Sequence, residues 1–117
     1  MRPFEDLRAW QLAHELTLGI YRSTRRYPRD ERFGLTSQAR RSASSVPANI
    51  AEGCGKRSKP QLRQSLDIAA GSLSELEYWL LLARELGYLP QDEYAARRAE
   101  LNEVRRLLIG FATWSAT

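Results

Sequence analysis

Apolar side chains along this chain recur at alternating steps of three and four residues, the spacing that places them on one face of an α-helix. The clearest run has steps of 4-3-4-3-4-3: Leu62, Leu66, Ala69, Leu73, Leu76, Leu80 and Ala83. No segment alternates apolar and polar residues with the β-branched enrichment that is typical of strands. The pattern therefore predicts an all-α protein.

Turn residues and capping residues divide the pattern into four predicted helices. The first extends from about Phe4 to Arg26 and ends before Tyr27-Pro28, because a proline disfavours helical geometry at the residue that precedes it. The second begins near Leu35-Thr36-Ser37, where a hydroxyl can cap the free amides, and stops at Gly53-Cys54-Gly55.

The last two predicted helices have equally clear boundaries. The third opens with Ser58-Lys59-Pro60-Gln61, an S-x-x-Q capping box, and ends near Gly87, a residue type favoured just after a helix. The fourth extends from about Gln91 to Trp114. Its arginine pairs, Arg97-Arg98 and Arg105-Arg106, interleave with glutamates, which indicates a solvated face of ion pairs.

Four such helices with short links make antiparallel neighbours, so we expect residues 1–117 to form one domain, an antiparallel up-down-up-down four-helix bundle. A lone bundle needs only one buried stripe on each helix. The second and third predicted helices are apolar or small on more than one face. This surplus favours a homo-oligomer over a monomer.

A polar stripe is the most unusual feature of the second predicted helix. It lies one position before the seam of small apolar residues and has the same spacing: Gln38, Ser42, Ser45, Asn49 and Glu52. Unpaired buried polar groups cost about 1–3 kcal/mol each, so these side chains need partners. Arg40 and Arg41 are too remote along the helix to pair with Glu52, which favours a partner from another helix or subunit. We interpret the stripe as a structural network that fixes helix register, with an active site as the alternative.

Pro47, inside the second predicted helix, should bend its axis near Ala43.

Residue types that carry catalytic or metal chemistry are scarce. The sole histidine, His14, lies one helical turn from Trp10, and we interpret it as a packed side chain. The sole cysteine, Cys54, lies near cations that could lower its thiol pKa, but with no second catalytic partner we interpret it as a small structural residue. No helix carries the Glu-x-x-His pair of a di-iron or di-manganese bundle. We expect no enzyme, no metal and no cofactor.

Residues 53–58 have the glycines and the lysine of a phosphate-binding loop, but Ile50 stands where a Walker A loop needs a glycine. Nucleotide hydrolysis is therefore not expected. The segment still brings Lys56, Arg57 and Lys59 to a helix N-terminus, which could receive a backbone phosphate.

Positive charge is concentrated in the first part of the chain. Residues 1–65 hold 13 Lys and Arg against 6 Asp and Glu, whereas residues 66–117 hold 5 against 8. Sixteen of the 18 cations are arginines, whose planar fork suits phosphate. This pattern predicts binding to RNA or another nucleic acid, the alternative being an ordinary surface of ion pairs. The candidate residues are Arg22, Arg25, Arg26, Arg40, Arg41, Lys56, Arg57, Lys59 and Arg63.

Three separated segments carry a resemblance to a known family. Residues 33–43 resemble its FGLTSQ-RR-A signature, residues 46–53 its P-NIAEG signature, and residues 66–76 its A-GSL-E element. Phe4, Leu7, Trp10 and Ala13 fit its opening helix, so that the match extends from Phe4 to about Leu89. The chain resembles the four-helix bundle family that is named for the 23S rRNA intervening-sequence proteins.

This resemblance implies an up-down-up-down bundle and ring-like homopentamers, with no catalytic residues attached to the signatures. Members of the family are encoded within insertions in bacterial large-subunit rRNA genes or stand alone. A related branch comprises accessory proteins of diversity-generating retroelements, which are basic barrels that associate with a reverse transcriptase and nucleic acid. The resemblance therefore also implies a second hypothesis, a protein-interaction scaffold or accessory subunit of a nucleic-acid enzyme.

The sequence predicts a cytoplasmic protein. No window holds the roughly 18 apolar residues that are needed to span a bilayer. The first six residues carry two acids and no apolar run, unlike a secretion signal.

Overall fold

Four long α-helices make up most of the part of the chain that this computed structural model describes, residues 3–116, with side chains described for residues 3–113. The helices are α1 (Arg8–Thr24), α2 (Leu35–Cys54), α3 (Lys59–Glu85) and α4 (Gln91–Ala116). Two short 3₁₀ turns, η1 (Phe4–Asp6) and η2 (Arg29–Glu31), lie before α1 and before α2. Residues 3–116 contain no strand, and the all-α prediction is confirmed.

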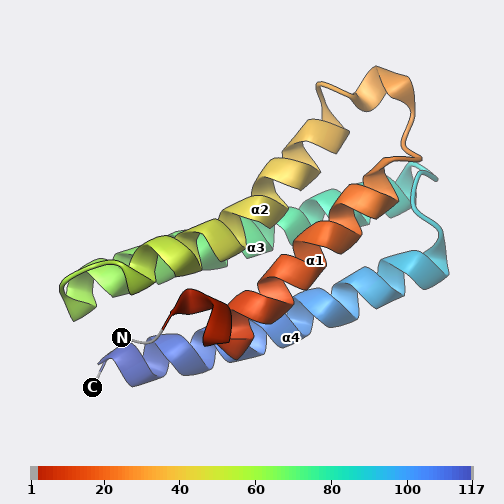
Figure 1. The fold of residues 1–117 in the computed structure, drawn as a ribbon. Coiled ribbons are helices and arrows are strands. Elements are labelled where there is room, and N and C mark those ends of the chain that lie inside the picture. The colour runs from red at the N-terminus through yellow and green to blue at the C-terminus, as the bar shows by residue number, and fades with distance from the viewer. Residues whose placement is uncertain (1–2, 117) are drawn as a thin grey trace.

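The helices form an antiparallel bundle in the order up-down-up-down (Figure 1). Each helix packs against the next one along the chain, and α4 closes the bundle against α1. The start of α1 and the end of α4 therefore lie at the same end of the bundle, opposite the segment that carries η2 (Figure 1). The four-helix bundle predicted from the sequence is confirmed.

The core consists of the periodic apolar positions. All seven residues of the α3 stripe are buried, and Ala39, Ala43, Val46, Ile50 and Gly53 of α2 are buried opposite them. The first and last helices complete the core with Ala13, Leu16, Ile20, Leu101, Val104 and Leu108. Burial of such side chains from water is the main favourable contribution to folding of a bundle of this size.

The ends of α3 follow the sequence. Ser58 is its N-cap, and the Ser58 hydroxyl accepts a hydrogen bond from the Gln61 amide, with a distance of 3.3 Å between Oγ and N. At the other end Gly87 has a φ of 79°, a left-handed conformation that glycine adopts without steric cost. The amides of Gly87 and Tyr88 donate to the carbonyls of Arg84 and Ala83, which satisfies the last turn.

Two predicted details at the other helix starts are wrong. No hydroxyl caps α2: its first amide, that of Leu35, donates to Oε1 of Glu31 at 3.1 Å. Gly34 permits this cap, because a Cβ at Gly34 would lie 2.8 Å from the same oxygen. The first helix starts at Arg8 rather than at Phe4, because the backbone is extended at Leu7 and separates η1 from α1.

Pro47 lies inside α2, and the helix continues through it. Figure 1 shows that α2 changes direction part-way along its length, as expected for a helix that contains an internal proline. Within residues 3–116, no helix is long and apolar enough to cross a membrane.

Candidate nucleic-acid interface

The structure separates the nine candidate cations into two groups at opposite ends of α2. Arg22, Arg25, Arg26, Arg40 and Arg41 lie around the end of α1 and the first turns of α2. Lys56, Arg57, Lys59 and Arg63 lie around the connection between α2 and α3. A helix of this length is about 30 Å long, so the two groups form two surfaces rather than one.

In the first group, two of the five arginines are neutralised. Arg26 forms an ion pair with Glu93 of α4, and Arg41 lies 3.2 Å from a carboxylate oxygen of Glu75 on α3. Arg22 and Arg25 are exposed and form no ion pair with any residue in the described part of the chain.

Arg40 has a different environment. Its Nε donates to Oγ1 of Thr24 at 2.8 Å, and its guanidinium lies over the ring of Tyr21, 4.7 Å from the ring centroid. Neither neighbour carries a negative charge. Arg40 is thus held in position while its positive charge stays uncompensated.

A basic depression lies where the chain turns from α1 to α2. It has a volume of about 410 Å³, and Arg25 and Arg40 of the candidate set line it. Arg29 and Arg32 line it as well, and sequence reasoning missed both because residues 29–34 were interpreted only as a connector. The high density of cations between residues 20 and 65 was the available signal.

In the second group Lys56 is paired with Glu52, with Nζ and Oε1 3.3 Å apart. The prediction that Glu52 takes its partner from another helix or subunit is therefore wrong, because the chain itself supplies a cation four residues later. Arg57 and Arg63 are exposed and form no ion pair with a described residue.

Burial raises the pKa of the Cys54 thiol, the opposite of what nearby cations would do.

The polar stripe of α2 meets polar residues of α3. Ser42 donates to Oε1 of Glu75 at 2.7 Å, and the indole N–H of Trp79 donates to both groups at 3.2 Å. The hydroxyls of Ser72 and Ser45 are 2.8 Å apart. Six residues form this α2–α3 polar seam: Ser42, Ser45, Asn49, Ser72, Glu75 and Trp79.

The seam joins second faces of α2 and α3 within one chain, although the sequence took such additional faces as favouring a homo-oligomer. Asn49 stays within its own helix and donates to the Ser45 carbonyl at 2.7 Å. Gln38, the first stripe residue, likewise accepts from Arg41 at 2.6 Å. The hydrogen bonds from Ser42 and then Trp79 hold the pKa of Glu75 below its ordinary value.

Every arginine of α4 has a carboxylate partner, and two of the four pair with the interleaved glutamates as the sequence predicted. Arg97 and Arg106 pair with glutamates three residues away on α4 itself, at 2.5 Å in both cases. Arg98 and Arg105 share one carboxylate of α3, that of Glu77, at 2.5 and 2.8 Å. These contacts, led by the hydrogen bond from Arg105, lower the pKa of Glu77.

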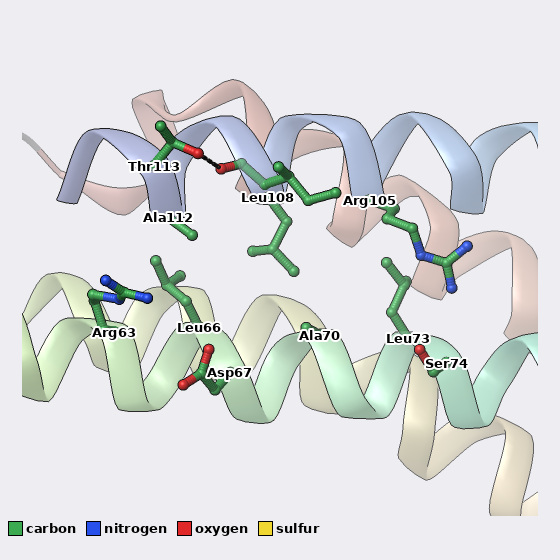
Figure 2. Close-up of a pocket in the computed structure, with 11 residues that line it drawn as sticks. Arg63, Leu66, Asp67, Ala70, Leu73, Ser74, Arg105, Leu108, Ala112 and Thr113 are labelled. Atoms are coloured by element: carbon green, nitrogen blue, oxygen red, sulfur yellow. Dashed lines mark hydrogen bonds between the residues drawn. The ribbon is translucent and has the colours of Figure 1, made fainter. Parts of the chain in front are cut away.

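A largely apolar groove of about 470 Å³ runs between α3 and α4 (Figure 2). Figure 2 shows Leu66 and Leu108 facing one another across it, with Arg63 toward one end and Arg105 toward the other. Ile109 also lines the groove and is 61% exposed. Such a surface is suited to an apolar partner rather than to phosphate.

The histidine with catalytic potential is engaged in packing. The ring of His14 stacks on Trp10, with centroids 4.9 Å apart and planes 8° from parallel, which confirms a packed histidine. The described residues contain no group of three or more His, Cys, Asp and Glu side chains that could hold a metal ion.

Comparisons with known proteins agree with this architecture. A sequence model of the 23S rRNA-intervening sequence protein family matches residues 5–110. The chain is similar to a crystal structure of a protein with unknown function from the S23 ribosomal protein family of Bacteroides thetaiotaomicron, with a TM-score of 0.80 and 26% sequence identity. The similarity covers 89% of this chain and 97% of that one. The comparison with curated proteins gives no match.

Proposed function

This chain belongs to the 23S rRNA-intervening sequence protein family, and we propose that it is a non-enzymatic, oligomeric helical bundle that binds RNA or another nucleic acid through its arginine-rich surface. The relative of known structure is itself a protein with unknown function. The proposal therefore rests on how the charges of this chain are distributed.

One observation carries the proposal: the arginines of α4 are paired with carboxylates, whereas most of those near the end of α1 are not. Arg97, Arg98, Arg105 and Arg106 all have a glutamate within 2.8 Å. Around η2, by contrast, several guanidinium groups converge on one depression that no acidic side chain lines. Uncompensated cations of this kind attract a polyanion and release its counterions on binding.

The non-enzymatic part of the proposal is supported by His14 and Cys54, the usual candidates for acid–base or nucleophilic catalysis. His14 is stacked on a tryptophan, and the raised pKa of Cys54 keeps its thiol protonated at neutral pH. We place the function in the cytoplasm, where bacterial RNA is found.

A filter-binding titration with labelled RNA and DNA tests the proposal. At low salt we expect retention of nucleic acid, and the logarithm of the association constant should fall linearly with the logarithm of the salt concentration. The absence of any association with RNA or DNA at low salt would refute nucleic-acid binding.

A second candidate function is a protein-interaction scaffold or an accessory subunit of a nucleic-acid enzyme such as a reverse transcriptase. The α3–α4 groove favours it, together with the exposed apolar side chains Ile68, Tyr78 and Ile109. Affinity capture with and without nuclease separates the two candidates. A partner protein held directly would remain bound after digestion, whereas a partner bridged by RNA would be lost.

The proposal includes self-association, with a homopentamer favoured by the family resemblance. The same exposed apolar side chains of α3 and α4 are available for contacts between copies. Light scattering coupled to size-exclusion chromatography measures the mass of the particle directly. A mass of one 13.4 kDa chain at all concentrations would contradict the oligomer.

A further inference from the structure

We propose that the depression between α1 and α2 is a phosphate site that holds the backbone of a single-stranded nucleic acid, with Arg29 and Arg32 as ligands beside Arg25 and Arg40. This inference rests on the proposed function and adds two residues that the sequence did not single out. It also places one of the two basic surfaces in direct contact with the ligand.

The charge inside the depression is not balanced. Four arginines line it, and no Asp or Glu is among its lining residues. The carboxylate of Glu31, which is close in sequence, is committed elsewhere: it accepts from the Leu35 amide at 3.1 Å and from the Tyr88 hydroxyl at 3.0 Å. Arg26, the neighbour of Arg25, directs its charge to Glu93. The lining arginines are therefore left for an external anion.

Two of these arginines are held in position by uncharged partners. Arg40 is fixed by Thr24 and Tyr21, and the Arg32 guanidinium lies over the Phe33 ring, 4.6 Å from its centroid. A ring orients a guanidinium without neutralising its charge. A phosphate that enters the depression thus meets donors that are already ordered, and arginine can bind it with two parallel hydrogen bonds.

The surroundings favour a single strand over a duplex. Phe33, whose ring contacts Arg32 of the depression, is 83% exposed, although burial of such a ring would be favourable. Tyr21, beneath Arg40, is also exposed. Unpaired bases stack on aromatic rings and on guanidinium planes, and paired bases inside a helix cannot. A phosphate bound in the depression, with a base stacked on Phe33 or Tyr21, would use both the arginines and the aromatic rings.

The test compares two double variants that each remove two positive charges. R29Q/R32Q removes the newly assigned ligands from the depression. R8Q/R106Q is the matched control, because Arg8 and Arg106 are exposed and lie toward the other end of the bundle. Fluorescence anisotropy with a labelled oligouridine of about 20 nucleotides measures affinity, and circular-dichroism melts verify that both variants fold.

At about 50 mM salt we expect R29Q/R32Q to bind at least about tenfold more weakly than the wild type, and R8Q/R106Q to change by less than about twofold. The slope of log K against log salt should decrease by about 1.4 for R29Q/R32Q, because about 0.7 is lost for each phosphate contact to a single strand. An unlabelled RNA duplex should compete less well than unlabelled oligouridine.

The possible failures are distinguishable. A wild-type protein that binds no RNA or DNA refutes the proposed function, and this site with it. A wild type that binds, with R29Q/R32Q equal to R8Q/R106Q, refutes the site alone and leaves nucleic-acid binding to the second basic group. A duplex that competes as well as oligouridine overturns the assignment to a single strand.

Discussion

The hydroxyl of Ser42 on α2 donates a hydrogen bond to the carboxylate of Glu75 on α3, with Oγ and Oε1 2.7 Å apart. This bond is the largest cause of the lowered pKa of Glu75. The Ser42 side chain is buried, whereas the Glu75 carboxylate is partly open to solvent. The pair therefore links the packing of two helices to the protonation of a group that water can reach.

Ser42→Ala should destabilise the protein by about 1 kcal/mol at pH 7, the typical net value of a lost hydrogen bond. A lowered folded-state pKa gives stability that is present above the ordinary glutamate pKa of 4.5 and is lost as the pH falls through the folded value. The cost of the substitution should therefore shrink toward pH 3. Urea unfolding at pH 7 and pH 3 measures it. The exposed Ser74→Ala is the control, and an S42A cost that is the same at both pH values would contradict the mechanism.

Glu77→Gln should destabilise the bundle by about 1–2 kcal/mol. Glu77 is the shared partner of Arg98 and Arg105, and its loss leaves two partly buried guanidinium groups without a carboxylate. Glu85→Gln removes the same charge from an exposed carboxylate that lies 3.8 Å from a single arginine, Arg84, and should cost less than about 0.5 kcal/mol. Thermal melts of both variants under the same conditions compare the two losses of stability. Equal losses would mean that the shared carboxylate does not join α3 to α4.

Gly53→Ala should destabilise the protein by about 1–3 kcal/mol, because α2 and α3 approach closely there. A Cβ at Gly53 would lie 2.8 Å from Cδ1 of Leu62 and 3.2 Å from Cβ of Ser65, both on α3. Gly71→Ala is the matched control, since nothing lies within 4 Å of its added Cβ and alanine favours a helix by about 0.5–1 kcal/mol. Urea unfolding should show shifts of opposite sign. A stabilised G53A variant would contradict the close approach.

Glu31→Ala should remove the cap of α2 and cost about 1 kcal/mol. The same carboxylate is the main cause of the raised pKa of Tyr88, so this pKa should move back toward its ordinary value. Absorbance titration of the tyrosines and urea unfolding give the two readouts. The neighbouring, exposed Asp30→Ala should change the stability by less than about 0.5 kcal/mol. A Tyr88 titration that is the same with and without Glu31 would contradict the hydrogen bond.

The helices and the core could be predicted because burial in a bundle repeats with the helical period. The seven α3 positions from Leu62 to Ala83 needed only that rule, and Gly87 needed only the known preference of helix ends. Which residues of two different helices form hydrogen bonds with one another could not be predicted in the same way. The α2 stripe was visible, but its alignment with Ser72, Glu75 and Trp79 depends on how far α3 extends along α2.

The basic depression shows the same limit. Arg40 meets Thr24, sixteen residues earlier, only because the turn at Pro28 and η2 returns the chain toward α1. Local sequence patterns describe Arg29 and Arg32 only as part of a connector. They also point to the nearby hydroxyls as the cap of α2, whereas the structure uses Glu31. Side chains in a short turn are directed by the backbone path, which no periodicity reports.

The polar seam has a mechanical consequence for any ligand that touches both ends of the protein. Sliding α2 lengthwise over α3 by one helical turn, about 5.4 Å, would part Ser42 from Glu75 and Ser45 from Ser72 together. A purely apolar contact between the same helices would resist this sliding far less, because one apolar neighbour can replace another. The distance from Arg40 on α2 to Arg63 on α3 is thereby held constant, and a strand long enough to touch both meets a spacer of set length.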